Sequence, residues 1–152
     1  MQPDRLKDLI HGKLKVYGLL SIREVSRGGQ SIYLVRMMSL PFIAQNDVTV
    51  TINRKGFTVS SGVIFDAKDS PKDVVSRVEA IVNDTAERSG LEAWKAADSF
   101  MVRKSGEDLA ELGGALVKVA EALRTLNRLL SEEEPVREEC LRKKAGQMLY
   151  FE

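Results

Sequence analysis

The sequence has few residues of the kinds that cross-link small proteins or hold metals in them. It contains one cysteine, Cys140, and one histidine, His11. A disulfide needs two cysteines, and a structural zinc site needs about four cysteine or histidine ligands. The 152 residues, the usual size of one domain, must therefore be stabilised by a buried hydrophobic core.

Long apolar runs are also absent. No stretch of about 18 consecutive apolar residues occurs, so no transmembrane helix is expected. Asp4, Asp8 and Glu24 interrupt the first 30 residues, which lack the continuous hydrophobic stretch of a secretory signal. Together with the single cysteine, these features predict a cytoplasmic protein with no membrane partner.

Neither sign of charge dominates, and aromatic residues are few. The 23 Lys and Arg residues nearly balance the 22 Asp and Glu residues, which excludes a polycation that coats nucleic acid by charge alone. Aromatic residues make up 6% of the chain, too few for a stacking platform for single strands. The balance hides a split, because residues 1–60 hold nine basic and four acidic groups.

The first half of the chain changes from a helical to a strand pattern. Apolar residues at helical spacing predict a helix over about residues 3–16. Alternation then predicts a hairpin through Gly28 and Gly29, because glycine adopts the positive φ angles that a tight turn requires. Residues 47–53 and 57–65 predict two further antiparallel strands.

The second half is mainly helical. A helix is expected between Ser70 and Gly90, while residues 91–103 read as a strand or a loop. A longer helix follows from Ser105, with apolar residues at alternating steps of three and four, the spacing of a coiled-coil seam. This seam consists of Leu109, Leu112, Leu116, Val119, Leu123, Leu126 and Leu130.

Two interpretations of the seam remain open. It packs on the sheet or the first helix of its own chain, or it is shared with a second copy or a partner helix. Gly113 and Gly114 lie within the same helix, at a cost in helix propensity of about 1 kcal/mol each. Glycines at such positions indicate close packing.

These patterns predict an α+β fold. We expect an N-terminal helix, an antiparallel sheet of four to five strands, a packed helix and the long heptad-patterned C-terminal helix. Residues 1–104 would form the sheet core, and residues 105–152 would form a helical C-terminal part of the same domain.

Three charged residues in the strand region allow an enzymatic interpretation. Asp47 begins one predicted strand, and Asp66 and Lys68 end the strand expected to pair with it. Carboxylates that hold Mg²⁺ beside a lysine that activates water are the components of a metal-dependent nuclease. The alternative is that these are solvated loop residues.

Basic residues on the hairpins suggest a binding surface. Arg27, Arg36, Arg54 and Lys55 fall on predicted strands and turns and define a basic edge. Such an edge can contact phosphates or an acidic protein partner. Charged residues also keep exposed strands from aggregating, which is the simpler interpretation.

Short motifs also suggest a family. Leu40-Pro41-Phe42 precedes Asn46-Asp47-Val48, and Ser105-Gly106-Glu107 opens the leucine-rich helix. Over about residues 33–130 the chain resembles an uncharacterised family of small bacterial and phage domains. The family has no established reaction, and the resemblance implies a phage-related or defence-related context. In topology the chain is also similar to secretion chaperones, which are dimeric binding modules and typically acidic.

The sequence therefore favours a non-catalytic protein-interaction module, an inhibitor or adaptor of phage or defence origin. It would act through the heptad helix and the basic edge, without a cofactor or metal, and a protein partner or self-association as a homodimer is expected. The alternatives are the nuclease-like enzyme, a secretion-chaperone-like dimer, and a nucleic-acid-binding protein that uses the basic edge.

Overall fold

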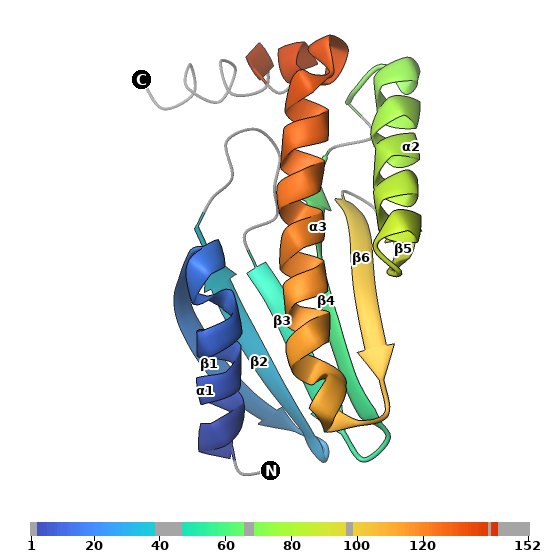
Figure 1. Ribbon diagram of the computed structural model, residues 1–152. Helices are drawn as coiled ribbons and strands as arrows, with labels where there is room; N and C mark the ends of the chain where they lie inside the picture. The colour runs from blue at the N-terminus through green and yellow to red at the C-terminus, as the bar shows by residue number, and fades with distance from the viewer. Residues whose placement is uncertain (1–2, 39–46, 66–68, 97–98, 140, 143–152) are drawn as a thin grey trace.

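The computed structural model describes residues 3–38, 47–65, 69–96, 99–139 and 141–142. It has the predicted α+β fold, with helices, 3-10 turns (η) and strands in a simple order along the chain (Figure 1). The elements are α1 (Pro3–Leu14), η1 (Lys15–Tyr17), β1 (Leu19–Arg27), β2 (Gln30–Met37), β3 (Asp47–Asn53), β4 (Gly56–Ile64), α2 (Lys72–Arg88), β5 (Glu92–Lys95), β6 (Ser99–Gly106), η2 (Leu109–Glu111) and α3 (Leu112–Glu132). Residues 134–139 and 141–142 are also helical.

The strands form one antiparallel sheet in the order β1-β2-β3-β4-β6-β5. It has six strands, more than the four to five expected, because residues 91–103 contribute two of them. Glu92–Lys95 pairs with the first half of β6, so that Trp94 lies opposite Met101. The alanines around Trp94 concealed this short strand, since alanine is uncommon in strands.

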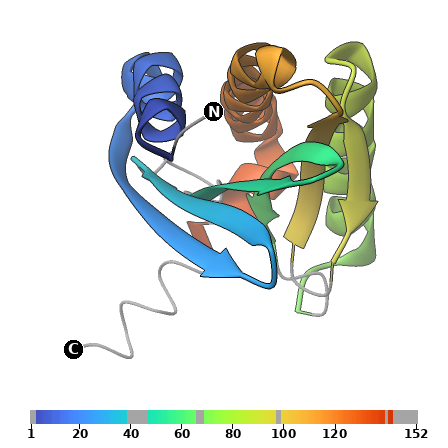
Figure 2. The ribbon, with the colours of Figure 1, turned by 90° about the horizontal axis from the view of Figure 1, so that it is seen from below.

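The helices α1, α2 and α3 lie on one face of the sheet (Figure 1, Figure 2). α1 lies beside β1 and β2, α3 crosses the middle of the sheet, and α2 lies along α3 and β5. No helix covers the opposite face within the part of the chain that the structure describes. We call this surface the open face.

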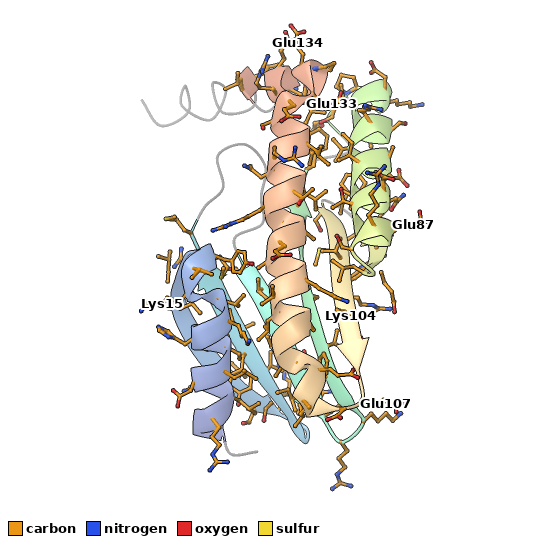
Figure 3. All side chains as sticks on the ribbon, viewed as in Figure 1. Lys15, Glu87, Lys104, Glu107, Glu133 and Glu134 are labelled. Atoms are coloured by element: carbon orange, nitrogen blue, oxygen red, sulfur yellow. The ribbon has the colours of Figure 1, made fainter. Side chains whose placement is uncertain are left out.

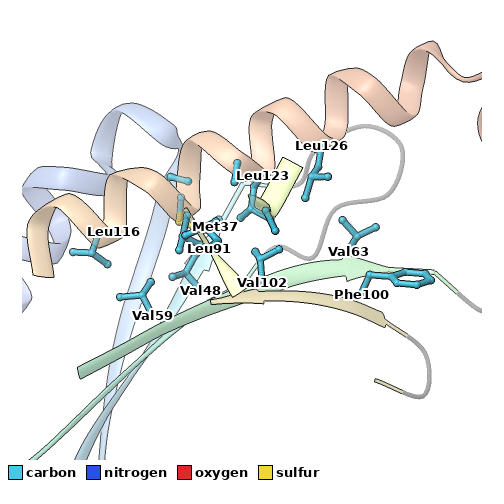
Figure 4. Close-up of a cluster of buried hydrophobic side chains, with 14 of the residues drawn as sticks. Met37, Val48, Val59, Val63, Leu91, Phe100, Val102, Leu116, Leu123 and Leu126 are labelled. Atoms are coloured by element: carbon cyan, nitrogen blue, oxygen red, sulfur yellow. The ribbon is translucent and has the colours of Figure 1, made fainter. Parts of the chain in front are cut away.

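The core lies between the three helices and the sheet. Side chains of α3 such as Leu116, Leu123 and Leu126 point toward strand residues that include Val59 and Val102 (Figure 4). Each of these five side chains is no more than 6% exposed. Burial of one large aliphatic side chain stabilises a protein by about 1.5–3 kcal/mol, so this layer is a main source of stability.

Tight turns connect the strands at one end of the sheet. Gly28 and Gly29 have φ angles of 56° and 78°, as the predicted hairpin between β1 and β2 requires. The turn between β3 and β4 is closed by Asn53, whose side chain accepts a hydrogen bond from the Lys55 backbone at 2.9 Å. Since β2 pairs with β3, the two turns lie on neighbouring hairpins at the same end.

Candidate interaction surface

The heptad seam faces the core of its own chain. Leu112, Leu116, Val119, Leu126 and Leu130 are fully buried and Leu123 is 6% exposed. Leu109 lies in the turn before α3 and is partly buried against the same core. Of the two interpretations of the seam, the structure shows packing within the chain. The six buried side chains are not exposed to a partner, because the sheet already covers them.

α3 also packs closely against α1. A Cβ atom at Gly113 would lie 3.0 Å from Cε of Lys13, so the glycine permits the close approach that the sequence indicated. Just beyond the same end of α1, Tyr17 of η1 donates a hydrogen bond to Glu121 at 3.0 Å, and the Arg124 guanidinium lies 4.5 Å from the tyrosine ring. Burial and this hydrogen bond raise the pKa of Tyr17.

The structure brings three of the four basic-edge residues together. Arg27 lies at the turn between β1 and β2, and Arg54 and Lys55 form the turn between β3 and β4. Arg36 lies near the far end of β2, where it is opposite Asp47. Basic residues therefore gather at the turn end of the sheet, and the basic edge of the sequence analysis is not one continuous surface.

An acidic side chain shares this turn end. Glu107 follows β6 and lies beside the turn between β3 and β4 (Figure 3). Within the described ranges, Arg27, Arg54 and Lys55 have no ion pair within 4.0 Å, because the ion pairs of the described residues all join other side chains. The three cations thus remain available to an anionic group from outside.

The open face has a distinct composition. Cross-strand pairing places one full row of side chains across it, from Arg23 through Leu34, Thr49, Ser60 and Arg103 to Glu92. Hydroxyl groups occupy the centre, where Thr58 and Ser105 lie 3.0 Å apart. Toward the two edges the face carries apolar and cationic residues, namely Arg23, Val25, Arg27, Ile32, Leu34, Arg36, Trp94, Met101 and Arg103.

Large apolar side chains on the open face are exposed to solvent. Leu34 is 36% exposed and Trp94 is 39% exposed. The Arg103 guanidinium lies 4.9 Å from the Trp94 ring and pairs with Glu92 at 2.9 Å. The tryptophan therefore has a fixed orientation, with an apolar surface that a partner can cover.

Of the three residues in the nuclease interpretation, the structure describes only Asp47. Asp47 is exposed on the open face beside Arg36, while Asp66 and Lys68 lie outside the described residues. Among the described residues no group of three or more His, Cys, Asp or Glu side chains is arranged to hold a metal ion. The described helices include none with the length and apolarity needed to span a membrane.

Comparisons with known proteins give no match. No protein-family model, no curated protein and no solved structure matches the chain. The resemblance to the uncharacterised bacterial and phage family, and the topological similarity to secretion chaperones, therefore stay predictions.

Proposed function

We propose that the protein is a non-catalytic protein-interaction module that binds its partner through the open face of the sheet. The observation that carries the proposal is the combination of a sheet covered on one side only with exposed Leu34 and Trp94 on the other. Sheets of this kind usually place polar residues toward water, so exposed leucine and tryptophan side chains need a reason.

The charged residues of the open face support a protein as the partner. Its cations are the arginines Arg23, Arg27, Arg36 and Arg103, with no lysine among the residues that cross-strand pairing assigns to this face. Protein interfaces are enriched in arginine, tryptophan and methionine and depleted in lysine. Tryptophan and arginine are also enriched among the residues that dominate binding energy.

The size of the open face is also suitable. Six strands at about 4.8 Å spacing span about 24 Å, and strands of seven to nine residues span about 23–30 Å. The face thus covers about 600 Å², which is comparable with the roughly 800 Å² that each partner contributes to a standard interface. In this proposal the open face replaces the heptad seam as the binding surface.

Affinity capture with matched variants tests the proposal. Tagged wild-type protein is compared with Leu34→Asp and Trp94→Ala in a lysate of the organism that encodes it. We expect a specific protein to be captured by the wild type and lost, by at least about tenfold, from both variants. Leu141→Asp is the control, because Leu141 is 50% exposed but lies outside the sheet.

The amount of partner captured is compared only between variants that are shown to be folded. Thermal unfolding must show that Leu34→Asp retains the wild-type midpoint within a few degrees, as expected for an exposed residue. A partner that binds wild type and both open-face variants equally would contradict the proposal. Loss of capture after nuclease treatment of the lysate would identify nucleic acid as the ligand and would also overturn it.

A further inference from the structure

The sheet has two edges of very different kinds. β5 is only four residues long and contacts α2. β1 at the opposite edge extends over nine residues, Leu19–Arg27, and pairs with β2 on one side only. Long edge strands present unpaired backbone groups, and proteins commonly shorten or cover them. β1 is neither short nor covered by a further strand.

The free backbone groups of β1 can be assigned from its pairing. In an antiparallel pair, alternate residues direct both backbone groups toward the neighbouring strand. Arg27 and Gln30 close the two-residue turn, so the backbone groups of Arg27 point toward β2, as do those of every second residue before it in β1. The alternate residues of β1 direct their N–H and C=O groups outward, away from β2. These outward residues are Ile22, Glu24 and Ser26. The register shift near Leu20 limits this regular edge to residues 21–27.

The side chains of the regular edge carry a definite charge pattern. Arg23 and Arg27 lie on the open face, and neither has an ion pair among the described residues. Glu24 lies on the helical side and pairs with Lys7 of α1 at 3.8 Å. An added strand therefore meets two unpaired cations on one face and one acidic residue on the other.

This pattern disfavours a second copy of the chain as the added strand. Two β1 strands related by a two-fold axis pair in antiparallel registers centred on one residue. Centring on Glu24 places it opposite its own copy, and centring on Arg23 does the same for that arginine. Centring on Val25 places Arg23 opposite Arg27, and every other register pairs too short a segment of residues 21–27. Like charges directly opposite each other destabilise a sheet.

We infer that β1 accepts an extended segment of a partner protein as a seventh strand, with acidic side chains opposite Arg23 and Arg27. Main-chain hydrogen bonds to Ile22, Glu24 and Ser26 supply affinity, and the two ion pairs fix register and direction. This inference rests on the proposed function. It adds that part of the partner binds at the β1 edge, next to Leu34 on the open face.

A synthetic peptide probes the edge directly. The peptide Asp-Thr-Val-Lys-Asp-Ile-Thr places its aspartates opposite Arg27 and Arg23 and its lysine opposite Glu24 in the antiparallel direction. Titration into ¹⁵N-labelled full-length protein should shift the amide signals of residues 21–27 and saturate below about 1 mM. A peptide with every charge reversed is the matched control and should bind at least about tenfold more weakly.

Two substitutions separate strand addition from simple charge attraction. Arg23→Glu should weaken the first peptide and strengthen the charge-reversed one. Ser26→Pro removes an outward N–H, so it should reduce binding of the first peptide at least about tenfold. Ser26→Ala keeps that N–H and should bind as the wild type does. Unfolding midpoints confirm that each variant is folded.

The possible failures are distinct. The inference is overturned if the peptide shifts no β1 signals at about 1 mM, if Ser26→Pro binds normally, or if Arg23→Glu does not change the charge preference. Self-association of wild type that Ser26→Pro abolishes would identify a second copy as the occupant and would also overturn it. Capture that depends on Leu34 and Trp94 but not on Ser26 would keep the proposed function and reject only the added strand.

Discussion

Two glycines at the turn end of the sheet allow neighbouring strands to approach closely. Gly56 has a φ angle of 138°, and a Cβ atom there would lie 2.0 Å from the backbone oxygen of Gly106. A Cβ atom at Gly106 would in turn lie 2.7 Å from the ring of Phe57. These two glycines let β4 and β6 approach where Phe57 enters the core.

Substitution at Gly56 should therefore be costly. We expect Gly56→Ala to lower the free energy of unfolding by about 2–4 kcal/mol, because both the backbone conformation and the space disfavour a side chain. Urea unfolding followed by circular dichroism measures the change. Gly114→Ala is the matched control, since nothing lies within 4 Å of its added Cβ atom, and it should stabilise α3 by about 1 kcal/mol. Equal effects of the two substitutions would contradict the assigned geometry.

The seam leucines should behave as core residues. We expect Leu116→Ala to destabilise the protein by about 2–5 kcal/mol, because its fully buried side chain would leave a cavity. Leu34→Ala, at a half-exposed position, should change stability by less than about 1 kcal/mol. Denaturation midpoints of both variants, measured with the oligomeric mass, test this difference. A stable Leu116→Ala monomer derived from a wild-type dimer would show that the seam is an interface instead.

The ionisation of Tyr17 is coupled to its contact with α3. Because burial and then the hydrogen bond to Glu121 raise the pKa of Tyr17 above about 10, folding favours the neutral phenol. The resulting stability is fully present below pH 10 and is lost as the pH rises through the raised pKa. We expect Glu121→Gln to shift the phenolate absorbance titration of Tyr17 to lower pH, with Tyr17→Phe identifying its signal. An unchanged titration would show that the hydrogen bond is not maintained in solution.

At the scale of the elements, α2 and α3 are joined at one end by an ion pair. Arg77 and Glu133 lie 2.6 Å apart across the two helices, and Figure 3 shows Glu133 at the end of α3. The hydrogen bond from Arg77 lowers the pKa of Glu133. Both side chains are partly exposed, so we expect a small contribution to stability, as is usual for surface pairs.

The sign of its pH dependence is defined. Since the folded pKa of Glu133 is lowered, the contribution is present above its unfolded value of about 4.5 and is lost as the pH falls through the lowered value. We expect Glu133→Gln to reduce the loss of stability between neutral and acidic pH, as measured by thermal midpoints across that range. Asp84→Asn is the comparison, because Asp84 pairs with Arg88 within α2 alone. Identical pH profiles for wild type and Glu133→Gln would reject the role of the pair.

Most elements could be predicted from the sequence, and their exceptions have physical reasons. Residues 47–53 alternate strictly, and Gly28-Gly29 supplies the two positive φ angles that a tight hairpin turn requires, so these elements follow from local rules. β5 does not, because its four residues are held by pairing with β6 and not by their own propensity. The heptad spacing of α3 predicted a helix correctly but did not identify its neighbour, since a sheet and a second helix can cover the same seam.

At the scale of the whole molecule, the open face was the feature that sequence reasoning missed. Val25, Ile32 and Leu34 are apolar at positions that alternation assigns to the solvent side, and this was the available signal. The basic edge was predicted as one surface, yet Arg36 lies at the other end of β2 from the turns. Such grouping depends on strand direction and register, which composition does not contain.

The order of strands has a further consequence for how the chain folds. β1 to β4 are consecutive along the chain and pair in that order, whereas Phe57 of β4 pairs with Gly106 of β6 only after α2 and β5 have been synthesised. Contacts between such distant residues close slowly, because long loops lose more entropy. The edge of β4 therefore stays unpaired while residues 65–106 are synthesised. The pairing that packs the Phe57 ring against Gly106 also covers a strand edge at which a nascent chain can aggregate.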